Sequence, residues 1–351
     1  MTIRSCLLAL VLAFLVTMYN NEKAAAAAPD DEFRVVDKFV LGGDSGWDYL
    51  TIDSAARRLY IGRFNRVMVV DVDSGKLAGE IGDMKGVHGV ALAPEFNRGF
   101  VSSGRDNTVR VIDLTTLKET GQIPTGKKPD AIIYDSSSKK VFAFCGGSHN
   151  ATVIDASTAK SAGEVELGGA PEFAVSDSKG TVFVNLEDKS EVVVIDVPTL
   201  KATAHWSLAP GATPAGLAID TEHHRLFSGC VESKTMVVLN TDSGKIVASL
   251  PIGEHSDATG FDPKTQNAFS SNGDGTLTVI HEDSPDSFRV VQNVATQPGA
   301  RTMAIDTKTH KVWLVTAEMK DAPNATVEQN RQHKIVAPDS FTALVVGENI
   351  K

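Results

Sequence analysis

The chain has 351 residues, of which 42% are hydrophobic and 22% are charged, and its formal net charge is -10 at pH 7. This acidic balance gives no electrostatic basis for general binding to nucleic acids or to anionic membranes. It therefore argues against nucleic acid as a partner, and it favours a protein, a peptide or a small molecule.

Residues 1–28 have the organisation of a secretory signal peptide. Arg4 precedes an apolar run from Cys6 to Met18, and the alanine tract from Ala24 to Ala28 offers small-residue cleavage sites. The apolar run is shorter than the roughly 20 residues that a membrane-spanning helix needs. We therefore predict a periplasmic or secreted protein that has no transmembrane span after cleavage.

A short hydrophobic strand with a nearly constant ending recurs six times. The copies are Val-Met-Val-Val-Asp71, Val-Arg-Val-Ile-Asp113, Ala-Thr-Val-Ile-Asp155, Val-Val-Val-Ile-Asp196, Met-Val-Val-Leu-Asn240 and Leu-Thr-Val-Ile-His281. Successive copies are 42, 42, 41, 44 and 41 residues apart. This period is typical of a repeat in which each copy forms one four-stranded blade of a β-propeller.

The third repeat illustrates the predicted blade. Strands are expected at Asp130–Tyr134, Val141–Cys145, Ala151–Asp155 and Ser161–Leu167, separated by polar turns. Cys145 and Cys230 occupy the same place in two repeats that a third repeat separates, which predicts two buried thiols and no disulfide.

Seven segments enter a blade, beginning near Trp47, His88, Asp130, Glu172, Ala215, Asp257 and Arg301. The seventh repeat ends without a fourth strand, whereas residues 33–43 have the form of a fourth strand that precedes the first blade. Pairing this N-terminal strand with Phe341–Val346 would protect two exposed edges. The sequence thus predicts an all-β, seven-bladed β-propeller of WD40-like architecture, with four antiparallel strands per blade, closed by the N-terminal strand joining the C-terminal blade.

This propeller is expected to form a single domain over residues 29–351. A loop insertion at residues 318–340 interrupts its last blade and carries Arg331, His333 and Lys334. A loop of this length in a compact domain is usually either functional or disordered, and if it is functional it could cover the channel.

The repeats resemble those of the YVTN-repeat β-propellers, which include YncE-like exported bacterial proteins. The resemblance covers residues 33–350 and rests on the pattern Val-x-Val-Ile-Asp-x-x-Thr-x-Lys, clearest at Val109–Gly126. The eponymous tetrad is degenerate: Trp313-Leu-Val-Thr316 comes near it, while another copy reads Leu59-Tyr-Ile-Gly62. Members of that family do not share one known reaction, so the resemblance implies a fold and export, and it does not imply a particular activity.

Counting the register of the first strands predicts a binding site at one mouth of the channel. Five residues before the aspartate that ends each first strand (alanine in the second repeat) lie Asp48, His88, Asp130, Glu172, Ala215, Asp257 and Arg301, which we call the mouth ring. Six of these seven residues can ionise. The predicted ligand-binding residues are therefore Asp48, His88, Asp130, Glu172, Asp257 and Arg301, together with Trp47, His149 and His255 from neighbouring loops. The alternative is that these polar groups merely hydrate the channel.

Three functions are compatible with such a ring. The first is a binding module that docks a protein, a peptide or a small cationic ligand, which is favoured because no recognisable nucleophile or cofactor motif occurs. The second is a metal-assisted hydrolase, such as a lactonase, in which Asp48, His88, Asp130, Glu172 and Asp257 supply ligands for a divalent metal ion. In that case His88 and these carboxylates would supply either metal ligands or a general base, and Arg301 would polarise the carbonyl, so that His88 and Arg301 are the candidate catalytic residues.

The third is a redox, quinoprotein-like accessory. DNA binding, which occurs among relatives in the family that the repeats resemble, is a further alternative that the negative charge weakens. The remaining histidines are expected to be surface residues in outer strands or in turns on the opposite face, namely His205, His223, His224, His281 and His310.

Overall fold

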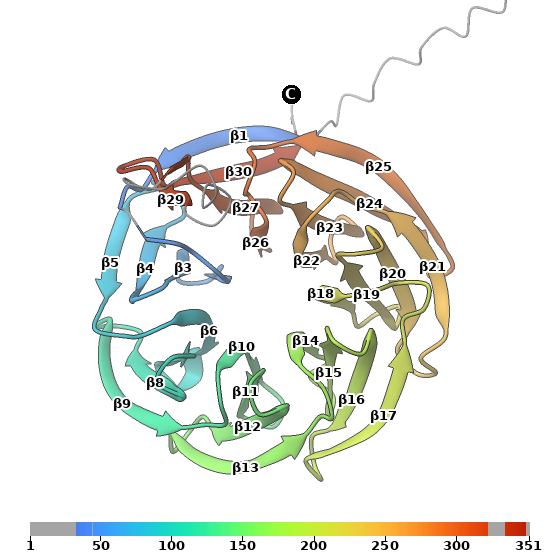
Figure 1. The fold of residues 1–351 in the computed structure, drawn as a ribbon, viewed down its shortest axis with the longest axis horizontal. Coiled ribbons are helices and arrows are strands. Elements are labelled where there is room, and N and C mark those ends of the chain that lie inside the picture. Colours follow the sequence, from blue (N-terminus) through green and yellow to red (C-terminus); the bar gives the residue numbers. More distant parts are fainter. Residues whose placement is uncertain (1–32, 44, 322–333, 349–351) are drawn as a thin grey trace, which may run out of the picture.

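The computed structural model describes residues 33–43, 45–321 and 334–348. Seven four-stranded antiparallel sheets stand radially around a central axis, as Figure 1 shows. The fold predicted from the repeat period is therefore confirmed. The predicted signal peptide lies outside the described residues, as do Arg331 and His333 of the insertion.

Blades 1 to 6 follow chain order, and within each blade the strands run from the axis outward. Blade 1 contains β2 (Leu50–Asp53), β3 (Arg58–Arg63), β4 (Arg66–Asp71) and β5 (Leu77–Ile81). Blade 2 contains β6 (Val87–Ala93), β7 (Arg98–Ser103), β8 (Thr108–Asp113) and β9 (Lys118–Pro124), with a short 3-10 helix η1 (Pro94–Phe96) after β6. Blade 3 contains β10 (Pro129–Asp135), β11 (Lys140–Cys145), β12 (Asn150–Asp155) and β13 (Lys160–Glu166).

The next three blades repeat this arrangement. Blade 4 contains β14 (Pro171–Ser176), β15 (Thr181–Leu186), β16 (Glu191–Asp196) and β17 (Lys201–Ser207). Blade 5 contains β18 (Pro214–Asp220), β19 (Arg225–Cys230), β20 (Thr235–Asn240) and β21 (Ile246–Pro251). Blade 6 contains β22 (Ser256–Asp262), β23 (Asn267–Asn272), β24 (Thr276–Ser284) and β25 (Ser287–Ala295).

Blade 7 joins the two ends of the described chain. Its inner strands are β26 (Thr302–Asp306) and β27 (Lys311–Thr316), followed by β30 (Thr342–Glu348) and, outermost, β1 (Phe33–Val40). β1 pairs with β30 antiparallel from Phe33 opposite Glu348 to Val40 opposite Thr342. The predicted closure of the ring is therefore confirmed.

The core lies between adjacent blades because the inner strands are covered on both faces. One buried cluster joins Phe100 and Val111 of blade 2 to Val141 and Ile154 of blade 3. The outermost strands are covered on one face only, and β17 accordingly alternates between exposed and half-buried residues. Both cysteines of the described chain, Cys145 and Cys230, are buried free thiols, as predicted.

The aspartates that end the first strands stabilise the turns on the face opposite the mouth through hydrogen bonds and ion pairs. Asp135 is fully buried and accepts hydrogen bonds from the Ser138 backbone N–H at 2.9 Å and from Ser176 Oγ of the next blade at 2.6 Å. Asp306 is also fully buried and pairs with Arg57 of blade 1 at 2.7 Å. These aspartates therefore stabilise the contacts between blades.

The prediction that five histidines are surface residues is only partly right. His205 and His224 are exposed, whereas His223, His281 and His310 are half-buried. His310 Nδ1 lies 3.0 Å from Oδ2 of the buried Asp262 in the preceding blade. His223 and His310 contact residues of a neighbouring blade, which cannot be read from a single repeat, whereas His281 Nδ1 lies 2.9 Å from Asn267 Oδ1 within its own blade.

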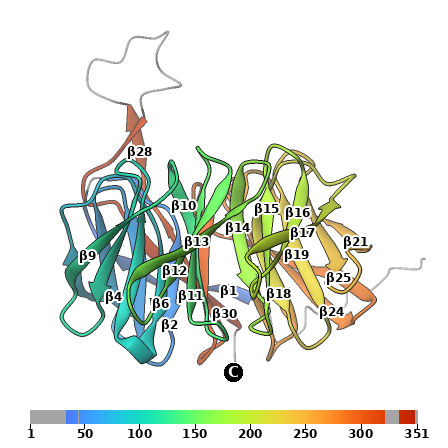
Figure 2. The ribbon, with the colours of Figure 1, turned by 90° about the horizontal axis from the view of Figure 1, so that it is seen from below.

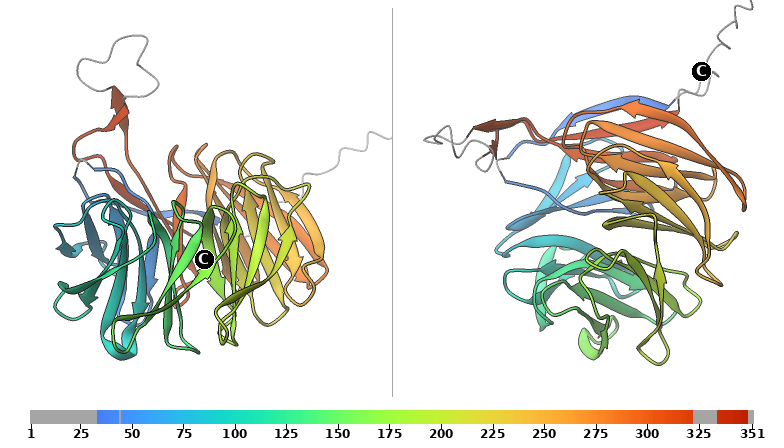
Figure 3. Two further views of the ribbon diagram at one scale, coloured as in Figure 1. Left: turned by 60° about the horizontal axis from the view of Figure 1, so that its bottom comes forward. Right: turned by 45° about the vertical axis from the view of Figure 1, so that its right-hand side comes forward.

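The insertion of the last blade begins as a two-stranded hairpin, β28 (Met319–Asp321) paired with β29 (Lys334–Val336). Figures 2 and 3 show this hairpin standing away from the propeller face instead of lying across its centre. Among the described residues, no helix is long and apolar enough to cross a membrane.

Candidate functional site

The structure places the mouth ring where the innermost strands begin. His88, Asp130, Glu172 and Asp257 lie near the start of β6, β10, β14 and β22, Asp48 lies just before β2, and Arg301 lies just before β26. The seventh position is the buried Ala215 in β18. The ionisable side chains lie close enough to pair and to alter one another's titration, as the following contacts show.

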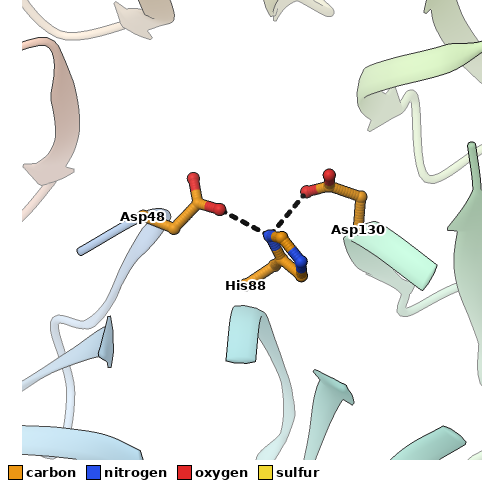
Figure 4. A group of neighbouring side chains, drawn as sticks. All are labelled: Asp48, His88 and Asp130. Atoms are coloured by element: carbon orange, nitrogen blue, oxygen red, sulfur yellow. Dashed lines mark hydrogen bonds and ion pairs between the residues drawn. The ribbon is translucent and has the colours of Figure 1, made fainter. Parts of the chain in front are cut away.

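His88 joins two carboxylates from neighbouring blades (Figure 4). Its Nδ1 lies 2.6 Å from Asp48 Oδ2 and 3.3 Å from Asp130 Oδ1. Burial lowers the pKa of His88, but the Asp48 hydrogen bond and the charges of both aspartates outweigh this effect and raise it overall. Burial and the charges of other carboxylates raise the pKa of Asp130 to about 6, against the opposing effect of His88. Both aspartate contacts therefore favour the protonated form of the His88 imidazole.

Arg301 makes the second ion pair of the ring. Its Nε lies 3.2 Å from Asp257 Oδ2. Burial raises the pKa of Asp257 to about 6, although the Arg301 charge opposes this shift. Both cationic members of the ring are thus already engaged with aspartates.

Glu172 is the ring carboxylate that has no such partner in the described structure. Burial, followed by the charges of Asp130, Glu187, Asp257 and Asp48, raises the pKa of Glu172 to about 9. Glu187 approaches from the loop between β15 and β16 and is exposed. Carboxyl groups therefore gather on this side of the mouth, and no described basic side chain forms an ion pair with Glu172.

Two cavities open beside the ring. The first, of about 210 Å³, contains the uncompensated acidic side and is lined by Glu172, Glu187, Ala215, Val231, His255, Ser256, Asp257 and Arg301. The second, of about 490 Å³, is lined by His88, Gly104, Arg105, Asn107, Lys127, Lys128 and Asp130. The mouth therefore has an acidic side at blades 4 to 6 and a basic rim at blades 2 and 3.

Two aromatic rings meet across the axis one residue along the chain from the mouth ring. Tyr49 of blade 1 and Phe173 of blade 4 have ring centroids 4.4 Å apart. Burial and then the charges of Asp130, Glu172, Asp48 and Asp257 raise the pKa of Tyr49 well above its ordinary value. This contact joins blades 1 and 4, which lie on opposite sides of the axis in Figure 1, and we call the two rings the aromatic floor of the mouth.

The sequence analysis missed this floor, although the signal is present in the repeats. The seven residues that follow the mouth ring are Tyr49, Gly89, Ala131, Phe173, Gly216, Ala258 and Thr302. Five of these residues are small, and they leave space along the axis. The rings of Tyr49 and Phe173 occupy this space.

The three predicted loop residues lie around the ring in different ways. His255 is exposed and lines the acidic cavity, and His149 is exposed in the turn between β11 and β12. Trp47 is half-buried and packs against Phe341, with 5.5 Å between ring centroids. Its indole therefore forms part of the wall between blades 7 and 1.

Gly62 in β3 allows the backbone of blade 1 to approach His88. A Cβ atom at Gly62 would lie 2.0 Å from the carbonyl oxygen of His88, so any side chain there must displace β6. We expect Gly62→Ala to destabilise the fold by about 2–4 kcal/mol, as for other overpacked positions. Chemical denaturation measures this loss. Gly121→Ala is the matched control because a Cβ at Gly121 meets nothing within 4 Å, and an equal loss in both variants would contradict the prediction.

Comparison with known proteins agrees with the fold and gives no family. No family model matches the chain, and no curated protein matches it in sequence. Among solved structures, the WD40 repeats of RRP9 are 9% identical over 91% of this chain and 98% of theirs, with a TM-score of 0.72. U3-55K is 9% identical over 89% of this chain and 98% of its own, also with a TM-score of 0.72.

A third solved structure, the hydrazine synthase of Kuenenia stuttgartiensis, is 16% identical over 70% of this chain and 97% of its own, with a TM-score of 0.51. At these identities the likeness concerns the fold alone. The chain is a seven-bladed β-propeller of WD40-like architecture, and this fold by itself does not specify a function.

Proposed function

We propose that this protein is an exported binding module of the YVTN-repeat type that captures a cationic organic group, such as an amine or a lysine side chain of a peptide, at the mouth ring. The predicted signal peptide supports export, and the repeat motif supports the type. The carboxylates around an aromatic floor support the ligand class, because ammonium groups are attracted both to carboxylates and to the faces of aromatic rings.

The observation that carries the proposal is the raised pKa of the buried Glu172 carboxyl, which has no cationic partner in the described structure. Its pKa of about 9 reflects burial next to other acids, and in the described structure no protein cation compensates for this. A ligand ammonium in the adjoining cavity of about 210 Å³ would replace the missing positive charge and favour the ionised carboxylate. Binding should therefore release a proton.

Isothermal titration calorimetry with putrescine and with a lysine-containing peptide tests this proposal. At pH 8 we expect Glu172→Gln to raise Kd roughly tenfold or more, since a charged hydrogen bond contributes about 1.5–3 kcal/mol. The heat of binding should also depend on the ionisation enthalpy of the buffer, because a proton leaves Glu172.

The matched control is Glu166→Gln, which removes the same charge from the exposed outer strand β13. It should leave Kd unchanged. Equal affinity in wild type and Glu172→Gln, or the absence of binding by both probes, would contradict the proposal.

A second candidate, metal-assisted hydrolysis, is supported by the geometry of Asp48, His88 and Asp130. One ligand atom from each lies within 4.8 Å of the others. An imidazole with two carboxylates suits a divalent cation, which would polarise an ester carbonyl and activate water. In the same titration, binding of Mn²⁺ that is lost in His88→Asn and retained in Glu172→Gln would favour this candidate.

A further inference from the structure

We propose that Asp220, His223 and Glu282 form a second site, independent of the mouth, that binds a divalent transition-metal ion such as Zn²⁺ between blades 5 and 6. Asp220 ends β18 and His223 lies in the turn that follows, whereas Glu282 lies in β24 of the next blade. This turn is on the face opposite the mouth, so a metal here would connect two blades without touching the mouth ring.

The three ligand atoms already converge. His223 Nδ1 lies 2.9 Å from Asp220 Oδ2 and 2.9 Å from Glu282 Oε1. These separations are hydrogen-bond distances, and small movements of the three side chains would open them enough to admit an ion with bonds of roughly 2.0–2.2 Å, the range for zinc with nitrogen and oxygen ligands. The His223 side chain is 30% exposed, which gives an ion a path from solvent.

Protein hydrogen bonds do not satisfy this cluster. An imidazole Nδ1 carries at most one proton, so it cannot donate fully to both carboxylates. Asp220 Oδ2 and Glu282 Oε2 are buried and accept no hydrogen bond within the described structure, although each carboxylate side chain is only 1% exposed. Glu282 Oε2 is thus a buried acceptor without a hydrogen-bond partner in the described structure, on the same carboxylate whose Oε1 contacts His223.

The nearest fixed cation is engaged elsewhere. Arg225 donates from Nε to the Pro285 carbonyl, from Nη1 to the His223 and His224 carbonyls, and from Nη2 to Asp286. Two buried carboxyl groups therefore face one imidazole, and Arg225 donates no hydrogen bond to either of them in the described structure. Uncompensated buried charge is strongly unfavourable, and a bound cation would remove it.

Comparison of the repeats indicates that Glu282 is a specific departure from the structural pattern. In blades 1 to 6 the residue after the third strand's repeat motif donates its backbone N–H to the first turn of the blade. These residues are Val72, Leu114, Ala156, Val197, Thr241 and Glu282. The four apolar ones are each at most 8% exposed, and Glu282 is 4% exposed. Apolar residues are therefore sufficient for packing at this position, whereas Glu282 places a carboxylate there that could bind a metal ion.

The chemistry of the three ligands selects the ion. Imidazole favours Zn²⁺ and its transition-metal neighbours, while Mg²⁺ and Ca²⁺ prefer oxygen ligands throughout. Three protein ligands leave at least one position for water. The expected role is to fasten blade 5 to blade 6.

The test is equilibrium dialysis of untagged, metal-stripped protein against Zn²⁺, with Co²⁺ absorption as a spectroscopic readout. Wild type and His88→Asn should retain the ion and show visible Co²⁺ bands. Glu282→Val, which installs the residue of the equivalent position in blade 1, should lose both while remaining folded. Glu282→Gln provides a second variant that keeps the side-chain shape.

Zn²⁺ should also raise the thermal midpoint of wild type and leave that of the Glu282 variants unchanged, since ligand binding stabilises only the state that binds. Equal Zn²⁺ retention by wild type and both Glu282 variants would overturn the proposal. Loss of Zn²⁺ in His88→Asn alone would assign the ion to the mouth, which also overturns it.

Discussion

A chain that begins at Leu41 is expected to lose the folded propeller, whereas a chain that begins at Pro29 should fold normally. The first chain lacks β1, which supplies the outermost strand of blade 7 and also contacts its neighbours. Phe39 stacks on Trp313 with 5.7 Å between centroids, and Phe33 packs edge-on against Phe269 of blade 6 at 5.6 Å. Gln292 of blade 6 bonds both backbone polar groups of Phe33.

The loss should exceed roughly 5 kcal/mol, because burial of each phenylalanine alone contributes about 1.5–3 kcal/mol and the edge of β30 becomes exposed. Circular dichroism and size-exclusion chromatography of the two chains would measure it. A monomeric Leu41 chain that melts within a few degrees of the Pro29 chain would show that β1 does not close the ring.

The second large effect is a fall in stability as pH rises from about 5 to 9. The pKa of Glu172 is about 9 in the folded protein and about 4.3 in an unfolded chain, so between these values the folded state holds the extra proton. Stability falls with rising pH wherever the folded state binds more protons. Asp130 and Asp257, with pKa values of about 6, add to the fall at the acidic end of this range.

Glu172→Gln should therefore be more stable than wild type at pH 8, by about 1 kcal/mol or more, since one pKa unit corresponds to about 1.4 kcal/mol. Urea denaturation at pH 5 and pH 8 would measure the difference, with Glu166→Gln as the control that should follow wild type. If the stability of Glu172→Gln declines with pH as steeply as that of wild type, the pH dependence does not come from Glu172.

The sequence predicted the fold well because a propeller repeats one local pattern. Strand positions in blade 3 agree within one or two residues, and the pairing of residues 33–43 with the last blade followed from a missing fourth strand. The register of the first strands also located the mouth ring, since equivalent positions in radial sheets lie at the same depth.

Contacts between side chains of different blades could not be predicted from the repeat pattern. Tyr49 and Phe173 come from blades 1 and 4, and their contact depends on side chains that cross the axis. The partial burial of His223 was not predicted, because its partner Glu282 lies 59 residues away in another repeat. A repeat pattern fixes each blade, whereas the pairs between blades depend on side-chain size and direction at single positions.

The stacked rings of Tyr49 and Phe173 have a consequence for traffic through the molecule. Because this contact crosses the axis, we expect a ligand that binds at the mouth ring to enter and leave on the same face of the propeller. A partner that binds over this mouth of the propeller would therefore control both the binding and the release of the ligand.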